Sequence, residues 1–184
     1  MMDLTSVADY RTFLARVYGF EAAAELELAQ VPAVASHVLG LRARVGCLRD
    51  DLLKLGHSSL DVDTLPRCKP IAIRSTAQAL GWLFVIERST LIAGLIRRHL
   101  ASQLPDAMAA SGYLDAYGTA AAERLRRFAE TASDYATRGI AHPDAIVGGA
   151  TRAFETQRQW YSRAHLRNRP ITQPIVRTRP RDAA

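Results

Sequence analysis

The sequence predicts an all-α protein whose helices form a single-domain bundle. Apolar residues recur with the spacing of one helix face along nearly the whole chain. No stretch alternates polar and apolar residues as a half-buried strand does, and no hairpin turn signal is present. Capping residues and prolines fall where the apolar stretches begin and end. The length of 184 residues, of which 48% are hydrophobic and 23% charged, fits one globular domain of about six helices.

The amino-terminal part of the chain predicts two helices and a long loop. Ser6 can cap the first helix, because its hydroxyl can accept from a free N–H of the first turn. Pro32 suits the first turn of the second helix, and Gly56 suits its carboxyl end. The two helices are expected at residues 5–30, with a weak point at Gly19, and at 32–55, and the loop at 57–70.

The rest of the chain predicts a long central helix and three further segments. Ser75 can cap the central helix, which is expected to run to Gln103 and to end before Pro105. The later segments are expected as a short helix or turn at 105–118, a helix from Thr119, and a last helix from Pro143. Residues 168–184 contain three prolines and predict a disordered Arg- and Pro-rich tail, which leaves residues 1–167 as the folded domain.

The basic balance of the chain does not by itself indicate a nucleic-acid-binding protein. The net charge is +6 and the pI is near 9.8. Much of the excess comes from arginines near the carboxyl terminus: Arg163, Arg167, Arg169, Arg177, Arg179 and Arg181. Because no nucleic-acid-binding motif accompanies the charge, no specific nucleic-acid partner is expected.

The amino terminus, the interrupted apolar run and the cysteine spacing together predict a cytoplasmic protein that is not embedded in a membrane. The amino terminus, M-M-D-L-T-S, lacks the basic and apolar parts of a secretory signal. Glu87 and Arg88 interrupt the longest apolar run before it reaches the roughly 18 residues of a membrane span. Cys47 and Cys68 have no C-x-x-C spacing and suggest no disulfide framework, which is typical of a reducing compartment.

An adjacent acid and base in the most apolar part of the chain indicate a functional or structural polar site. Residues 80–94 read L-G-W-L-F-V-I-E-R-S-T-L-I-A-G, so Glu87 and Arg88 lie in the middle of an expected core helix. Buried charges require partners. We expect either an internal ion network or a polar ligand between helices at this point. If Arg88 belongs to such a network, replacing it with Ala should cost about 3–5 kcal/mol.

Few other side chains form a pattern that carries chemistry. None of the five histidines has a Glu three residues before it, so a di-iron bundle is not expected. His37, inside a mainly apolar helical stretch, is interpreted as a core or boundary residue, with metal ligation as the alternative. Gly148 and Gly149 predict a close helix–helix approach, or backbone contact with a ligand. Arg152, one turn after Gly148, is either solvated or able to hold an anionic group.

Two segments of the first two expected helices form part of an ordered pattern: Y-R-T-F-L at 10–14 and L-R-A-R-V-G-C-L-R-D-D-L-L-K-L-G at 41–56. They resemble an early helix of the haem oxygenase family, especially of the bacterial, bacteriophytochrome-associated type, and the segment that follows that helix. Residues 79–100 resemble the distal haem helix, and D-A-Y-G at 115–118 resembles a family turn. The pattern A-x-x-A-F-x-x-x-x-x-W in the last helix resembles the closing pattern, so the resemblance spans about residues 10–165.

The resemblance implies a helical bundle with a haem pocket, from which this chain departs at key positions. Haem oxygenases hold haem between a proximal helix that supplies an axial histidine and the distal helix, and they cleave it to biliverdin. No histidine precedes residues 10–14 here, and the distal glycine positions are Arg88, Ile92 and Ala93. Side chains are therefore expected to fill the porphyrin volume. The candidate pocket residues are Arg88, Ser89, Ile92, Ala93, Gly94, Tyr117 and Arg152.

Three hypotheses follow from the resemblance and from these departures. The first is a degenerate haem-oxygenase-like protein without efficient haem cleavage and without an expected cofactor, which binds a protein partner or a flat, tetrapyrrole-like or elongated ligand and has a regulatory role. The second is a haem oxygenase that produces biliverdin, either through His37 as a non-standard axial ligand or through a proximal helix encoded upstream of Met1. The third is a structural helical domain that forms homo-oligomers. We favour the first.

Overall fold

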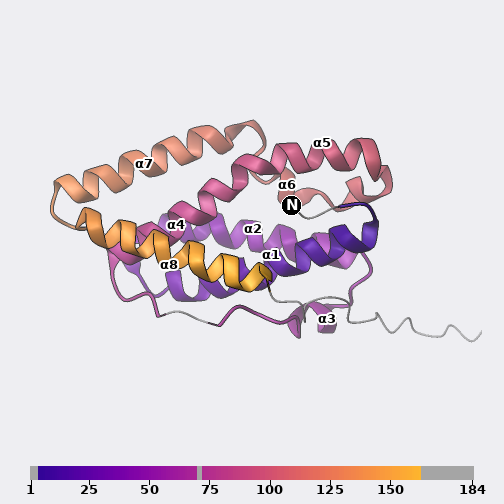
Figure 1. Cartoon of the computed structure of the whole chain (residues 1–184), viewed down its shortest axis with the longest axis horizontal. Coiled ribbons are helices and arrows are strands. Elements are labelled where there is room, and N and C mark those ends of the chain that lie inside the picture. The colour runs from indigo at the N-terminus through magenta and orange to yellow at the C-terminus, as the bar shows by residue number, and fades with distance from the viewer. Residues whose placement is uncertain (1–3, 70–71, 163–184) are drawn as a thin grey trace, which may run out of the picture.

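The protein is an all-α bundle, as the sequence predicts (Figure 1). The computed structural model describes residues 4–69 and 72–162, and these residues contain helices and connecting segments but no strand. The predicted tail at 168–184 and the predicted domain end at 167 lie outside the described residues.

The first two long helices form an antiparallel pair. α1 spans Val7–Leu28 and α2 spans Ala35–Lys54, with the short helix η1 (Pro32–Val34) between them. The Ser6 hydroxyl accepts from the N–H of Asp9 at 3.1 Å, which confirms the predicted cap. Gly56 follows α2 with a φ of 93°, the left-handed conformation expected where a helix ends.

The predicted loop after α2 contains one short helix. α3 spans Ser59–Asp63 and is held by a capping box: the Ser58 hydroxyl accepts from the N–H of Asp61, and the Asp61 carboxylate accepts from the N–H of Ser58. The prediction of an irregular segment throughout 57–70 is therefore wrong at this point. A single turn with reciprocal caps needs no apolar periodicity, so periodicity did not reveal it.

The predicted central helix is two helices joined by a short turn. α4 spans Thr76–Ser89 and begins after the predicted cap Ser75; η2 (Thr90–Ile92) and α5 (Ala93–Gln103) follow. In Figure 1, α4 and α5 meet at an angle. The hydroxyl of Ser89 donates to the carbonyl of Ile86, and that of Thr90 to the carbonyl of Glu87, both at 2.6 Å. Such bonds between a side chain and the preceding turn favour a tighter, bent backbone.

The remaining elements follow the predicted order with shifted ends. The segment expected as a short helix or turn contains η3 and α6, and α7 begins two residues after the expected Thr119. The last helix begins at Pro143, as predicted. The bounds are Pro105–Ala110 for η3, Gly112–Asp115 for α6, Gly118–Ala120 for η4, Ala121–Thr137 for α7 and Pro143–Ser162 for α8.

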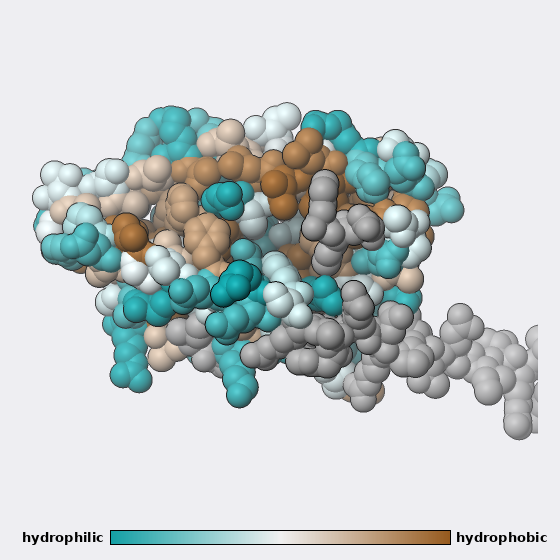
Figure 2. All heavy atoms as spheres, in the orientation of Figure 1, coloured by the Kyte–Doolittle hydropathy of each residue, from teal (hydrophilic) through white to brown (hydrophobic). Residues whose placement is uncertain are grey.

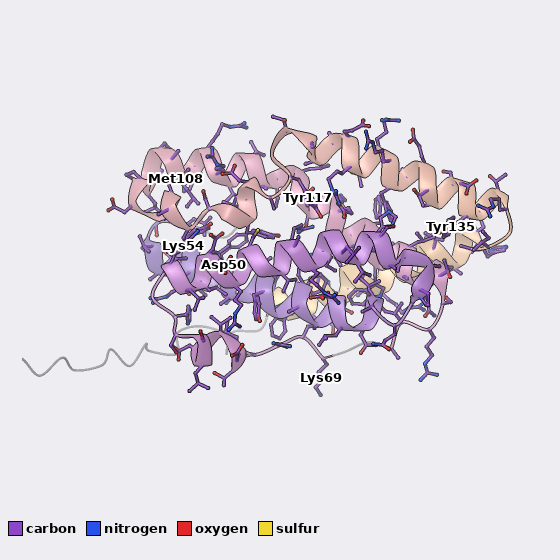
Figure 3. The ribbon with its side chains drawn as sticks, turned by 180° about the vertical axis from the view of Figure 1, so that it is seen from behind. Asp50, Lys54, Lys69, Met108, Tyr117 and Tyr135 are labelled. Atoms are coloured by element: carbon purple, nitrogen blue, oxygen red, sulfur yellow. The ribbon has the colours of Figure 1, made fainter. Side chains whose placement is uncertain are left out.

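Two apolar clusters form the core, one at each end of the bundle. The first is centred on α4, where Phe20 stacks on Trp82 with ring centroids 5.8 Å apart. The second surrounds the amino-terminal half of α1, including Tyr10 and Leu14. Tyr161 packs against both clusters. α8 lies on the face turned to the viewer in Figure 1, and α2 lies on the opposite face, seen in Figure 3.

Glycines allow α4 and α8 to pack closely. A Cβ atom on Gly81 would lie 2.3 Å from the carbonyl oxygen of Ile146, and one on Gly149 would lie 2.8 Å from that of Gln78. A Cβ atom on Gly148 would meet no atom within 4 Å. The predicted close helix–helix approach is therefore confirmed for Gly149, and it is wrong for Gly148.

One helical stretch of the described chain, Thr76–Gln103, is long and apolar enough to cross a membrane, even though Glu87 and Arg88 interrupt it. Half of its most apolar window is buried inside the bundle. The core helix of a globular protein has the same composition, so this stretch is weak grounds for a membrane location.

Candidate functional site

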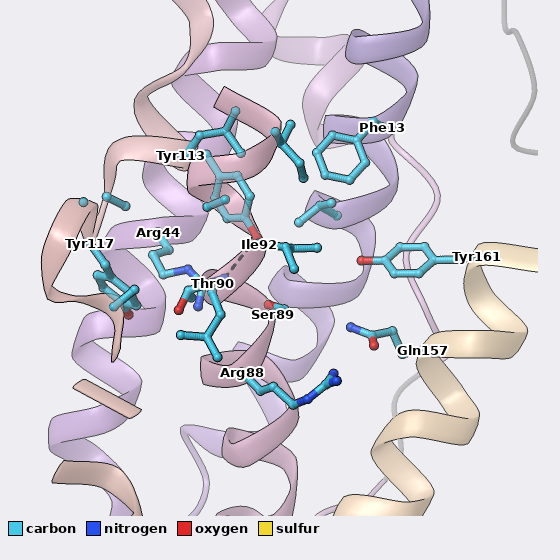
Figure 4. A pocket seen from close by; sticks show the side chains of 18 residues that line it. Phe13, Arg44, Arg88, Ser89, Thr90, Ile92, Tyr113, Tyr117, Gln157 and Tyr161 are labelled. Atoms are coloured by element: carbon cyan, nitrogen blue, oxygen red, sulfur yellow. Dashed lines mark hydrogen bonds between the residues drawn. The ribbon is translucent and has the colours of Figure 1, made fainter. Parts of the chain in front are cut away.

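A cavity of about 280 Å³ opens beside the turn between α4 and α5 (Figure 4). Its walls come from α1, α2, the α4–α5 junction, the segment from α6 to the start of α7, and α8. Most of the wall is apolar, and Phe13, Val17, Ile92, Ile96 and Leu114 contribute to it. A concave apolar site with a few polar groups is the usual form of a small-molecule pocket.

The structure brings together most of the predicted pocket residues. Five of them line the cavity: Arg88, Ser89, Ile92, Ala93 and Tyr117. Gly94 and Arg152 are not among the lining residues, and Arg152 is exposed on α8. Arg152 is therefore not the residue that could hold an anionic group in this cavity.

Although the sequence predicts that side chains fill the volume beside Ser89, they do not fill it completely, because a cavity of about 280 Å³ remains there. Ile92 stands in the wall and keeps 53% of its surface exposed. The 3₁₀ turn at η2 places Ile92 away from the position that a continuous α-helix would give it. The hydroxyls of Ser89 and Thr90, which donate to carbonyls of the preceding turn, favour the bend at this point.

A buried ion pair lies at the base of the cavity. Arg44 of α2, only 1% exposed, donates to the carboxylate of Glu21 on α1, which is 2% exposed. The Tyr113 hydroxyl accepts from Nη2 of Arg44 at 3.0 Å and donates to Oε1 of Glu21 at 2.8 Å. Arg44 and Tyr113 line the cavity, whereas Glu21 lies behind them. Sequence reasoning missed all three residues.

Aromatic rings hold the Arg44 side chain in place. Its guanidinium carbon lies 5.3 Å from the ring centroid of Tyr113 and 5.2 Å from that of Tyr117. Burial raises the pKa of both tyrosines, so their hydroxyls stay protonated and neutral. The positive charge of Arg44 is therefore surrounded by the two rings and by the carboxylate of Glu21, and it is not available to bind an anion.

Two buried carboxylate oxygens near this base lack a hydrogen-bond donor. Within the described residues, Oε2 of Glu21 and Oε2 of Glu87 have no partner. Burial raises the pKa of Glu21, while the nearby Arg44 opposes that shift. Buried acceptors are normally satisfied, so the polar cluster behind the cavity retains unused hydrogen-bonding capacity.

Arg88 lies at the mouth of the cavity and not in the internal ion network. Its guanidinium lies over the ring of Phe154 on α8, 5.5 Å from the centroid, and its side chain is exposed. Figure 4 shows Arg88 extending from α4 toward α8, and Gln157 and Tyr161 extending from α8 toward the cavity. The opening is therefore surrounded by a cation, an amide and a phenol.

No histidine among residues 4–69 and 72–162 lines the cavity. His37, the candidate metal ligand, is half-buried on α2. Its ring packs edge-on against that of Phe128, with the ring centroids 5.4 Å apart. The described residues also contain no group of three or more His, Cys, Asp or Glu side chains that could hold a metal ion. His37 is therefore not among the residues that line the cavity.

No protein-family model, no curated protein and no solved structure matches this chain. Its function is therefore inferred from the site itself.

Proposed function

We propose that the protein binds a small flat or elongated organic molecule in the cavity beside Ser89, and that it does not cleave haem. The observation that carries the proposal is the cavity itself: an apolar interior of about 280 Å³ with polar groups confined to its base and its mouth. That distribution suits a ligand whose body is apolar and whose polar group remains near the opening.

Two features argue against haem as the ligand. A haem iron needs a protein donor, and none of the described residues that line the cavity is a His, Cys or Met. Tyrosine can also bind haem iron, but burial raises the pKa of the lining Tyr113, Tyr117 and Tyr161 and so disfavours the phenolate that would bind it. The cavity volume of about 280 Å³ is also too small, because it lies below the roughly 300–1,000 Å³ of pockets for drug-sized ligands and a porphyrin is larger than most such ligands. The residues present therefore do not fit the group that the family resemblance implies.

A catalytic role finds no support in the side chains that face the cavity. The Ser89 hydroxyl donates to the carbonyl of Ile86, and Arg44 is paired with Glu21. Burial raises the pKa of Tyr161, which keeps its hydroxyl protonated. None of these groups forms the pair of nucleophile and base that covalent or acid–base chemistry requires.

A biliverdin-producing haem oxygenase remains the second candidate for one reason. The cavity opens beside Ser89, on the segment that resembles the distal haem helix. In that case the axial ligand would have to come from a residue other than His37, because His37 does not face the cavity.

One pair of titrations on the full chain distinguishes these candidates. The first uses 1-naphthylamine, a fluorophore that is uncharged at pH 7 and whose naphthalene body matches the size of the cavity, and the second uses haemin. We expect saturable one-to-one binding of the fluorophore, no sharp Soret band with haemin, and no biliverdin absorbance after reduction in air. A one-to-one Soret band followed by biliverdin would establish the haem oxygenase instead. An absence of fluorophore binding would exclude the ligand-binding function, and self-association or a protein partner would then be sought by sedimentation and pull-down.

A further inference from the structure

We infer that the natural ligand is a monocarboxylate with a compact apolar body, and that Arg88 binds its carboxylate at the mouth of the cavity. This inference rests on the proposed ligand-binding function and specifies the class of ligand. Three observations carry it: the charge balance of the cavity wall, the donors around its opening, and the size of its interior.

The cavity wall carries one uncompensated positive charge. Its charged lining residues are Arg44 and Arg88. Arg44 is neutralised by Glu21. Among the described residues, no acidic side chain lies within 4 Å of the Arg88 guanidinium, whose contact is the ring of Phe154. A ligand with a single negative charge would neutralise the site, whereas a cationic ligand would be repelled.

The side chains around the opening offer hydrogen-bond donors. Gln157 and Tyr161 are one turn apart on α8 and therefore lie on the same face of the helix. Neither side chain makes a hydrogen bond within the described residues, and Figure 4 shows both directed at the opening that Arg88 reaches from α4. A guanidinium, an amide N–H and a phenolic O–H thus lie on the same side of the cavity. A carboxylate has the acceptor sites for all three.

Phe154 limits the movement of Arg88 before any ligand binds. The guanidinium lies over its ring at 5.5 Å from the centroid, within the range of a cation–π contact. Restricting a long side chain in this way reduces the conformational entropy that ligand binding would otherwise cost. The planar guanidinium of an arginine can donate two parallel hydrogen bonds to a carboxylate, which the ammonium group of a lysine cannot do.

The interior limits the size of the ligand body. At about 30 Å³ for each water in the liquid, a volume of 280 Å³ holds roughly nine waters. Because each water contributes one non-hydrogen atom, the part of the ligand that the cavity encloses has on the order of ten non-hydrogen atoms. Phe13 and Val17 on one side and Ile92 and Ile96 on the other give this part an apolar surface on both sides.

Competition against the uncharged fluorophore tests the inference. The competitors share one ten-carbon aromatic body: 2-naphthoate, 2-naphthamide and 2-(aminomethyl)naphthalene, which are anionic, neutral and cationic at pH 7. We expect naphthoate to compete best and the amine worst. Arg88→Gln should weaken naphthoate about tenfold and change the fluorophore and naphthamide by less than about twofold. Arg152→Gln removes the same charge from the exposed part of α8 outside the cavity and serves as the matched control, which should leave all three unchanged.

The outcomes separate this inference from the proposed function. If the fluorophore binds and the three competitors displace it equally, or if Arg88→Gln and Arg152→Gln weaken naphthoate to the same extent, the monocarboxylate assignment is overturned while the ligand-binding function stands. If the fluorophore does not bind the wild-type protein at all, both proposals fail.

Discussion

Glu87 is paired with Arg124 of α7 and not with its neighbour Arg88. Oε1 of Glu87 lies 3.6 Å from Nη2 of Arg124, and Glu87 is buried. Arg88, the next residue of α4, points to the cavity mouth and is exposed. The end of α4 therefore separates two roles: Glu87 belongs to the interior of the bundle, whereas Arg88 is available to a ligand. The predicted internal network exists, but Arg88 is not part of it.

This separation predicts opposite stability effects for two arginines. Arg44→Ala should lower the free energy of unfolding by about 3–5 kcal/mol, because it leaves the buried Glu21 without its counter-ion. Arg88→Ala should lower it by no more than about 1 kcal/mol, because the side chain is exposed and loses only its cation–π contact with Phe154. Urea unfolding followed by circular dichroism, with equal m-values, measures both. A loss for Arg88→Ala as large as that for Arg44→Ala would contradict the structure.

Arg44→Ala also has an internal control. Combining Glu21→Gln with Arg44→Ala removes both charges, so the double variant should be more stable than Arg44→Ala alone. Equal destabilisation of the two would mean that lost packing, and not an unpaired carboxylate, accounts for the effect.

Neighbouring glycines on α8 should respond to alanine in opposite directions. Gly149→Ala would place a Cβ atom 2.8 Å from the carbonyl oxygen and 2.9 Å from the Cα atom of Gln78, and such overpacking costs about 1–3 kcal/mol. Gly148→Ala meets open space and should stabilise α8 by up to about 1 kcal/mol. Thermal unfolding of the two variants tests the closeness of α4 and α8. If Gly149→Ala melts at the wild-type temperature or above, the helices do not approach as described.

His37 should make the protein less stable in mild acid. Burial lowers the pKa of His37, while the nearby Glu87 opposes that shift. The unfolded chain, with an ordinary pKa near 6.5, then binds more protons than the folded protein. The free energy of unfolding should therefore fall as the pH drops below about 6.5 and through the lower folded pKa. Urea midpoints between pH 7.5 and pH 5 measure the slope.

The control for this pH dependence is the exposed His142. His37→Gln should flatten the slope, and His142→Gln should leave it as in the wild type. Part of the slope should persist in His37→Gln, because burial also lowers the pKa of His57. A slope that is unchanged in His37→Gln would show that His37 is as protonatable in the folded protein as in the unfolded chain.

Local chemistry explains why most helix ends could be predicted from the sequence. Ser75, Gly56 and Pro143 act within one turn of the helix they begin or end, so their effect is visible without the tertiary structure. The break at Thr90 was not predicted, because Ser and Thr occur inside many continuous helices. Their hydroxyls favour a bend only where the neighbouring helices permit one.

The candidate site was predicted only in part, because its base depends on which charges are buried. Arg42 and Arg44 lie two positions apart on α2, and each pairs with a Glu of α1, Glu25 and Glu21 respectively. The Arg42 side chain is 61% exposed and that of Arg44 is 2% exposed. The sequence contains both pairs, and only the packing of α1 against α2 determines which one is internal. By contrast, Arg88, Ser89, Ile92 and Ala93 line the cavity together because they are consecutive or nearly so.

The apolar surface near the cavity is compatible with ligand entry. Figure 2 shows hydrophobic surface gathered over α5 and its junction with α4, and the exposed apolar residues there include Leu91, Ile92 and Leu95. Exposed apolar patches of this kind commonly mark binding sites.

Filling the cavity from two sides is the most direct test of the central claim that it is the ligand-binding site. Ala93→Phe and Ala116→Phe introduce a ring at lining positions of two separate segments, and Gly148→Ala, outside the cavity, is the control. Fluorophore titration should show one-to-one binding to the wild type and to the control. It should show a loss of at least about tenfold in affinity for both Phe variants, while circular dichroism shows that they remain folded. Wild-type affinity in both folded Phe variants would contradict the account.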